Sequence, residues 1–149
     1  MILTSLVWVT IGGVGYWFMN RGLPDFEVAV DLPETVTMGE VFKMEVAVKN
    51  VGSSNLTLAD LDVYSEFLDG FEIVSVDPKP RSTSHTFGIL THGYSEKLAP
   101  SEVFEVEFEL RATAVGYWGG DIDACTPTQN YVTHYTEIDV VDVMAPEDE

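Results

Sequence analysis

The side chains with the most chemical potential in this chain are one cysteine and three histidines. Cys125 is the only cysteine of the sequence, and the histidines are His85, His92 and His134. A thiolate with two imidazoles is a typical ligand set for copper, and the same groups bind zinc. These four residues are therefore the metal-site candidates, with Met144 as a distant axial ligand for copper.

The spacing of these residues argues against a working site. A copper loop of this kind carries a histidine a few residues after the cysteine, but Gln129 and Asn130 stand there, and His134 follows Cys125 by nine residues. We therefore expect no metal and no cofactor. A cupredoxin-like copper domain, most simply a degenerate one, remains an alternative.

Carboxylates form a second candidate site. Asp60 and Asp62, like Asp121 and Asp123, are spaced by two residues, so in strands each pair would lie on one face. Calcium could bind such pairs, and solvated surface carboxylates are the simpler interpretation.

Neither nucleophile is placed for catalysis. Ser82, Ser84 and His85 are neighbours, but no acid is positioned to orient the histidine as a triad requires. Cys125 lies near aspartates, and a negative field raises the pKa of a thiol. We therefore interpret Cys125 as a structural thiol and predict that the chain is not an enzyme.

The elements that must position these residues are strands. Apolar side chains alternate with polar ones through 41–49 and 103–110, which is the period of strands buried on one face. In immunoglobulin-type topology these two strands pair, and Lys43 and Lys49 would then oppose the glutamates of 103–110 and favour one register. Further strand candidates, separated by turn signals, are 26–32, 56–63, 71–77, 83–90, 116–125 and 131–143, with a helical turn within 59–68. The pattern predicts an all-β, Greek-key sandwich of seven to nine strands over 23–143, followed by an acidic tail at 144–149.

Three motifs point to a family. Val36-x-x-Gly39-x-x-Phe42 and Val46-x-Val48-x-Asn50-x-Gly52 resemble the opening strands of bacterial and archaeal immunoglobulin-like domains of the CARDB and adhesion type. Residues 116–123 (GYWGGDID) resemble their penultimate strand. The resemblance implies an immunoglobulin-like sandwich used as a spacer, binding surface or accessory domain, and it transfers no functional residue.

The N-terminus predicts a membrane anchor. Residues 2–19 carry no charge, and a helix of that length rises about 27 Å, close to the roughly 30 Å hydrocarbon core of a bilayer. No basic n-region or Ala-x-Ala site marks a signal peptide, although a cleaved signal or a buried soluble helix is an alternative. We therefore expect a single transmembrane helix within 1–22. Arg21, on the domain side, favours a cytoplasmic domain, whereas the β-rich domain favours the periplasm or cell surface, which is our prediction.

Two groups of residues are candidates for partner contact. Small residues let another helix approach closely, and exposed aromatic rings are enriched at protein contacts. The candidates are Trp8, Gly12, Gly13 and Gly15 in the span and Tyr117, Trp118, Tyr131 and Tyr135 around the final hairpin. The alternative for the residues of the span is that they simply face lipid. The alternative for the aromatic residues is that they close one end of the sandwich.

Composition limits the choice of partner. The chain has 25 acidic and 7 basic residues and a net charge of −18. Such a surface repels nucleic acid and anionic lipid, and it suits a basic soluble protein, a divalent cation or a salt-rich environment.

Together these features predict a non-catalytic accessory or structural subunit of a larger membrane complex, for example an energy-transducing, electron-transfer or photosynthetic assembly. Its partners would be integral membrane subunits and a basic soluble protein. A filament or surface-adhesion subunit is the alternative from another class.

Overall fold

The computed structural model describes residues 23–143. The expected anchor at 1–22, with Trp8 and the glycines at 12, 13 and 15, and the expected tail at 144–149 lie outside the described residues. Between 23 and 143 no helix is long and apolar enough to cross a membrane.

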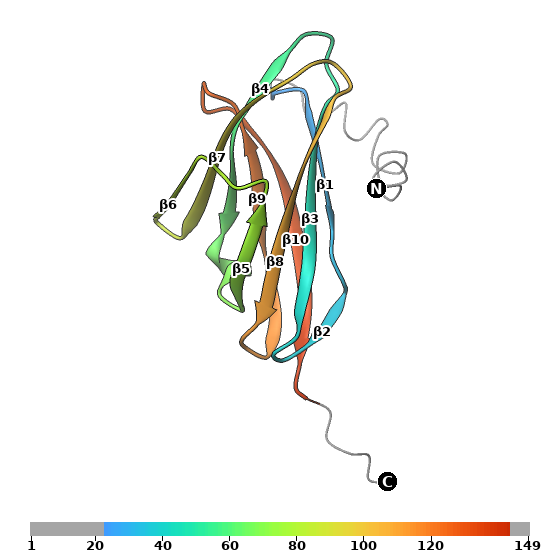
Figure 1. Ribbon diagram of the computed structural model, residues 1–149, viewed down its shortest axis with the longest axis vertical. Coiled ribbons are helices and arrows are strands. Elements are labelled where there is room, and N and C mark those ends of the chain that lie inside the picture. Colours follow the sequence, from blue (N-terminus) through green and yellow to red (C-terminus); the bar gives the residue numbers. More distant parts are fainter. Residues whose placement is uncertain (1–22, 144–149) are drawn as a thin grey trace.

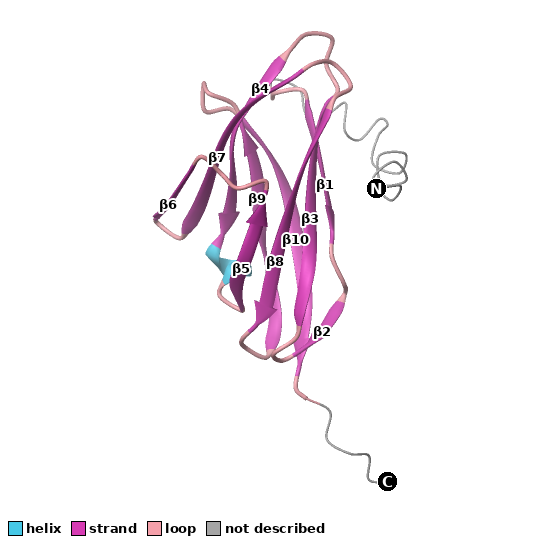
Figure 2. Cartoon of the chain, viewed as in Figure 1, coloured by secondary structure: helices cyan, strands magenta, loops and turns pink. Residues whose placement is uncertain are grey.

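Two sheets pack face to face (Figures 1 and 2). The smaller sheet has the order β1-β3-β8-β5, with strands β1 (Phe26–Asp31), β3 (Val41–Asn50), β8 (Val103–Ala112) and β5 (Phe71–Asp77). The larger sheet has the order β2-β10-β9-β4-β7-β6, with strands β2 (Thr35–Thr37), β10 (Tyr131–Val141), β9 (Gly116–Cys125), β4 (Leu56–Tyr64), β7 (Ile89–Leu98) and β6 (Ser82–Thr86). One helical turn, α3 (Ser65–Leu68), joins β4 to β5 and lies within the segment expected to hold it.

The all-β prediction is confirmed, but the strand count is not. Residues 23–143 form ten strands instead of seven to nine. The expected strand 83–90 is a hairpin, because Phe87 (φ 51°) and Gly88 (φ 76°) turn the chain between β6 and β7. The short β2 is the other addition, and it pairs in parallel with the end of β10.

The strands at 41–49 and 103–110 pair as expected. β3 lies antiparallel to β8, with Val46 opposite Val106. The apolar side chains of both strands point into the core, and Lys43 Nζ lies 3.4 Å from Glu107 Oε2 on the opposite face. Because both charged groups are solvated, the ion pair contributes at most about 1 kcal/mol and mainly favours one register.

The core lies between the sheets and extends under α3. Phe67 of α3 is fully buried, and its ring centroid lies 5.1 Å from that of Phe71. Phe42 of β3 meets Phe71 edge to face at 5.5 Å. These contacts hold α3 against the smaller sheet at the end where β4 passes to β5.

Asn50 links the sheets at the opposite end. Its side-chain nitrogen donates to the carbonyls of Ser54 and Leu98, both at 2.9 Å, and its side-chain oxygen accepts from Gly52 N–H at 2.9 Å. Leu98 belongs to the larger sheet, so this buried amide closes the β3–β4 turn and ties it across the sandwich. The Asn50-x-Gly52 motif is therefore structural.

Candidate functional site

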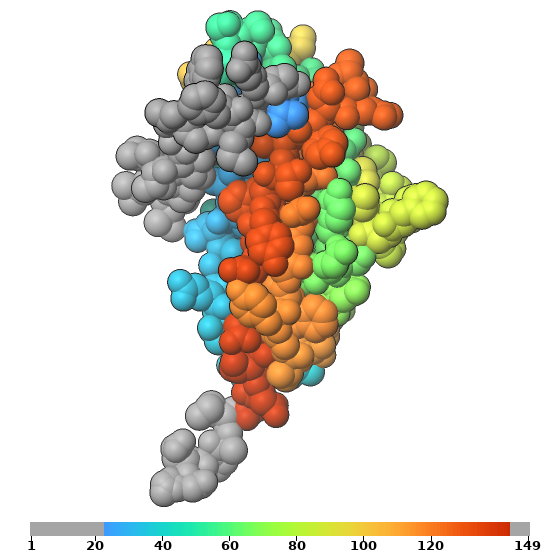
Figure 3. Space-filling view, turned by 180° about the vertical axis from the view of Figure 1, so that it is seen from behind, coloured from blue at the N-terminus to red at the C-terminus, as the bar shows by residue number. Residues whose placement is uncertain are grey.

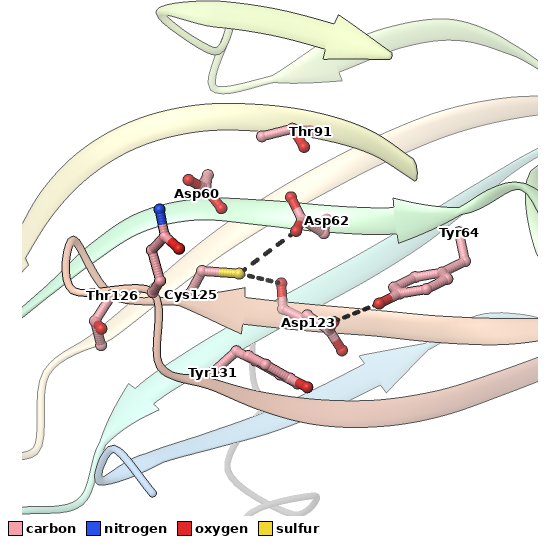
Figure 4. A pocket seen from close by; sticks show the side chains of 9 residues that line it. Asp60, Asp62, Tyr64, Thr91, Asp123, Cys125, Thr126 and Tyr131 are labelled. Carbon is pink, nitrogen blue, oxygen red and sulfur yellow. Dashed lines mark hydrogen bonds between the residues drawn. The ribbon is translucent and has the colours of Figure 1, made fainter. Parts of the chain in front are cut away.

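The candidate site lies on the outer face of the larger sheet. Asp60 is opposite Cys125 and Asp62 is opposite Asp123 where β4 pairs with β9. Tyr131 of β10 is opposite Cys125 on the other side. Since directly opposed residues point to the same face, three neighbouring strands bring these side chains together (Figure 4).

A pocket of about 330 Å³ opens between these side chains. It is lined by Asp60, Asp62, Tyr64, Thr91, Asp123, Cys125, Thr126, Gln129 and Tyr131. Each of these side chains carries an oxygen or, in Cys125, a sulfur, which suits a cation or a small polar group better than a purely apolar ligand.

Three potential ligand atoms converge in the pocket. One oxygen each from Asp60 and Asp62 and the sulfur of Cys125 lie within 4.8 Å of one another. The Cys125 thiol donates to Asp62 Oδ2 at 3.6 Å. The other oxygen, Asp62 Oδ1, is buried and has no hydrogen-bond partner. A buried carboxylate oxygen without a donor is costly, and a bound cation would satisfy it.

Asp123 forms the floor of the site. It is 3% exposed, and its two oxygens accept hydrogen bonds from the Tyr64 hydroxyl at 3.0 Å and the Thr133 hydroxyl at 2.7 Å. Burial raises the pKa of the Asp123 carboxyl, while these two hydrogen bonds lower it. Asp123 therefore orders the walls of the pocket.

Electrostatics keep the thiol protonated. Burial, followed by the charges of Asp62 and Asp60, raises the pKa of Cys125 far above its usual value. Burial also raises the pKa of Asp60. A thiol in this environment is a poor nucleophile, and the aspartates that act on it most strongly are those of β4 rather than Asp121 of its own strand.

The histidines do not join Cys125. His92 is 1% exposed and meets Phe108 edge to face at 5.1 Å in the core, where burial lowers its pKa. His134 of β10 is opposite Ile122, a core residue of β9, so it lies on the face away from Cys125. His85 is on β6, which β4 and β7 separate from β9. Of residues 23–143, only Asp60, Asp62 and Cys125 form a group of three potential ligands. The described residues thus give the copper alternative no ligand set, and Met144 lies outside them.

Comparison with known proteins places the fold. No protein-family model matches the chain, and no curated protein matches it by sequence. Among solved structures, the CARDB domain of a Pyrococcus furiosus protein, determined in complex with di-metal ions, is 19% identical with a TM-score of 0.54, over 80% of this chain and 90% of that one. The fold is a CARDB-type immunoglobulin-like sandwich.

Two other solved structures are similar at lower identity. A cohesin module of a Clostridium perfringens family 33 glycoside hydrolase has 9% identity and a TM-score of 0.53, over 80% of this chain and 99% of that one. The Bacillus subtilis sporulation control protein Spo0M has 17% identity and a TM-score of 0.52, over 80% of this chain and 50% of that one. The expected resemblance to CARDB domains is thus confirmed for the fold.

Aromatic residues extend the site along the outer face of this CARDB-type sandwich. Tyr117, Tyr131 and Tyr135 are 64%, 49% and 56% exposed and lie on the same face of β9 and β10. The surface of these two strands is orange to red in Figure 3. Trp118, the fourth aromatic candidate, differs. It points inward and donates from Nε1 to the Ala114 carbonyl at 2.9 Å, so it closes one end of the sandwich.

The pocket combines expected and unexpected residues. The two-residue spacing correctly placed Asp60 and Asp62 on one face, but Asp121 does not line the pocket. Tyr64 and Thr91 were missed because only the pairing of β4 with both β9 and β7 brings them to the site. The signal in the sequence that pointed to this pocket was the two-residue spacing of aspartates in β4 and again in β9.

Proposed function

We propose that this chain is a non-catalytic accessory subunit of a larger membrane complex. Residues 2–19 anchor it, and the acidic sandwich lies outside the cytoplasm, where it docks a basic protein. The docking surface is the outer face of β4, β9 and β10. The observation that supports this proposal is that exposed tyrosines are interspersed with carboxylates on that one face.

The chemistry of this face suits a protein partner. Tyr117, Tyr131 and Tyr135 offer apolar area with a polar tip at little entropic cost. The surrounding carboxylates and the net charge of −18 would steer a basic partner into contact. A partner bound here would cover the tyrosines and pair with the carboxylates at the rim.

The experiment starts from the membrane. The intact chain is purified in mild detergent with its stoichiometric partners, and association with the purified partner is measured at increasing ionic strength. We expect the association rate to fall at least about tenfold between low and high salt. A rate that does not depend on salt would reject the docking role.

Variants locate the contact. Tyr117→Ala with Tyr135→Ala removes two exposed rings of the docking face and should weaken binding by about 2 kcal/mol or more. Val74→Ala, at an exposed position of β5 in the other sheet, is the matched control and should leave binding unchanged. If both variants bind the partner with equal affinity, the contact does not include these two tyrosines.

A divalent cation in the pocket is the second candidate function. Asp62 Oδ1 is buried without a partner beside Asp60 and Cys125, and the similar P. furiosus domain was determined with di-metal ions. Titration calorimetry of the chelator-treated protein with Ca²⁺, Mn²⁺ and Zn²⁺ tests binding. Asp62→Asn should abolish the heat of cation binding, whereas Asp121→Asn, on the same face outside the pocket, should retain it. The absence of heat with all three ions would reject this candidate.

A further inference from the structure

The edge of the larger sheet at β6 is open. β6 is the last strand of the sheet, pairs only with β7, and exposes all five residues, Ser82 to Thr86. The β6–β7 hairpin projects from the body of the sandwich (Figure 1). An uncovered edge strand is a template for pairing with another chain, and within 82–86 neither a proline nor an acidic or lysine side chain blocks it.

The turn decides which backbone groups are available. Phe87 and Gly88 both have positive φ and form a two-residue turn with Thr86 opposite Ile89. The closing pair of such a turn is hydrogen-bonded, and hydrogen-bonded pairs alternate along an antiparallel ladder. The backbone of Ser84 therefore points to β7, and the N–H and C=O groups of Thr83 and His85 point away from it.

We propose that β6 pairs antiparallel with β6 of a second copy of this chain, about a two-fold axis at Ser84. In this register Thr83 of each copy exchanges backbone hydrogen bonds with His85 of the other. The contact is isologous, so it closes after two copies and makes one continuous sheet across the dimer.

Charge complementarity selects a second copy as the occupant. Lys79 and Arg81 precede β6, and neither forms a salt bridge with another residue of 23–143. In the proposed register they lie beside the Phe87–Gly88 turn of the other copy. There, Ser65 donates from its N–H and hydroxyl to the Gly88 carbonyl at 2.8 and 2.7 Å, which places α3 against the turn.

One acidic residue, Asp69, and one exposed aromatic ring, Phe87, lie at that turn. A hollow of about 300 Å³ lies beside it and is lined by Asp69 together with Ser65, His85 and Leu90. Phe87, at the tip, is 97% exposed. Arg81 of one copy would pair with Asp69 of the other and lie over its Phe87 ring, a cation–π geometry. Symmetry doubles these contacts, which place positive groups against a negative one where two chains of net charge −18 meet.

Site-specific cross-linking tests the register. The full-length chain in detergent carries Cys125→Ser, so that each added cysteine is the only one. Ser84→Cys lies opposite itself in a non-hydrogen-bonded pair, with Cα atoms about 4.5 Å apart, within disulfide reach. We expect rapid formation of a disulfide-linked dimer on mild oxidation.

Thr86→Cys is the matched control, because it lies on the same face of the same exposed strand. In the proposed register its two copies are about 14 Å apart, beyond disulfide reach. It should cross-link at least about tenfold more slowly than Ser84→Cys, and a mixture of Ser82→Cys and Thr86→Cys chains should form the heterodimer. Equal rates for the Ser84 and Thr86 variants, or no dimer from either, would overturn the proposal.

A charge exchange tests the occupant. Arg81→Glu should slow the Ser84→Cys cross-link, and adding Asp69→Lys should restore it, while circular dichroism confirms that each variant is folded. If the folded variant with both charge changes cross-links as slowly as Arg81→Glu alone, the assigned pairing of Arg81 with Asp69 is contradicted. Tyr117→Ala with Tyr135→Ala should leave the cross-link unchanged, which separates this dimer from the proposed docking face.

Discussion

At the scale of single residues, the polar face shows how neighbours decide chemistry. Cys125 is a reactive residue type, but burial, followed by the charges of Asp62 and Asp60, raises the pKa of its thiol. Asp123 is an acidic residue type, but two hydroxyl donors hold both of its oxygens. These neighbours make Cys125 a poor nucleophile and leave carboxylate oxygens as the main polar groups around its sulfur.

The ionisation of Asp60 should make stability depend on pH. Burial raises its pKa above 3.8 in the folded state, so the folded chain binds this proton more tightly than the unfolded chain. Its contribution to stability is complete below 3.8 and is lost as pH rises through the folded pKa. Asp60→Asn should therefore gain stability relative to wild type between about pH 4 and about pH 7.

Urea unfolding at both pH values measures this effect in chelator-treated protein. Asp31→Asn, at the exposed end of β1, is the control for removing one charge. A difference between Asp60→Asn and wild type that stays constant with pH would contradict the prediction.

At the scale of elements, close contacts between strands and α3 position the site. β9 passes so near α3 that Gly120 is pressed against the backbone of Phe67. At the other end, the buried amide of Asn50 holds the β3–β4 turn to β7. These contacts keep β4 between β9 and β7, where its aspartates meet Cys125.

Adjacent glycines on β9 should respond differently to an added methyl group. A Cβ on Gly120 would lie 2.9 Å from Phe67 N, so Gly120→Ala should cost about 1–3 kcal/mol of unfolding free energy. A Cβ on Gly119 would meet the hydroxyl end of Tyr135, an exposed side chain that can turn away. Gly119→Ala should therefore cost less than about 1 kcal/mol. Chemical denaturation measures the unfolding free energy of both variants. Equal losses would contradict the prediction, because they would mean that the backbone of α3 moves aside as readily as the Tyr135 side chain.

Loss of the Asn50 amide should weaken the whole sandwich. Asn50→Ala removes three hydrogen bonds and leaves the carbonyl of Leu98 without this buried donor, which should cost about 2–4 kcal/mol. Asn55→Ala, at an exposed position of the same turn, is the control and should change stability by less than about 0.5 kcal/mol. Thermal and urea unfolding measure both variants, and a comparable effect of the two would show that Asn50 is not the link between the sheets.

At the scale of the whole molecule, negative charge dominates. With 25 acidic and 7 basic residues, the folded chain repels itself, and compaction raises that repulsion. The two salt bridges within 23–143 involve Lys43 and Arg111 on solvated surfaces, so they offset little of it.

Added salt should therefore stabilise the domain. Between about 0.01 M and about 1 M NaCl the Debye length falls from about 30 Å to about 3 Å, which screens the repulsion. A gain of about 1 kcal/mol would raise Tm by roughly 4 °C in a domain of this size. Scanning calorimetry measures the shift, and Glu34→Gln with Asp142→Asn should reduce it. A Tm that falls with salt would contradict the prediction.

The sequence by itself determined the fold class and much of the local structure. Alternation of apolar and polar residues is a local property with a period of two, so it predicted that β3 and β8 are each buried on one face. Their pairing with each other was expected from immunoglobulin-type topology. The same alternation failed at 83–90, where two residues with positive φ make a turn that the apolar pattern did not reveal.

Only the tertiary structure decided the candidate site. Asp60 and Asp62 are separated from Cys125 by more than sixty residues, and no local pattern says that β4 inserts between β9 and β7. That order depends on long-range packing of the whole core, because each strand could in principle pair with several others. For the same reason the sequence could name His92 as a ligand candidate, whereas packing placed it in the core against Phe108.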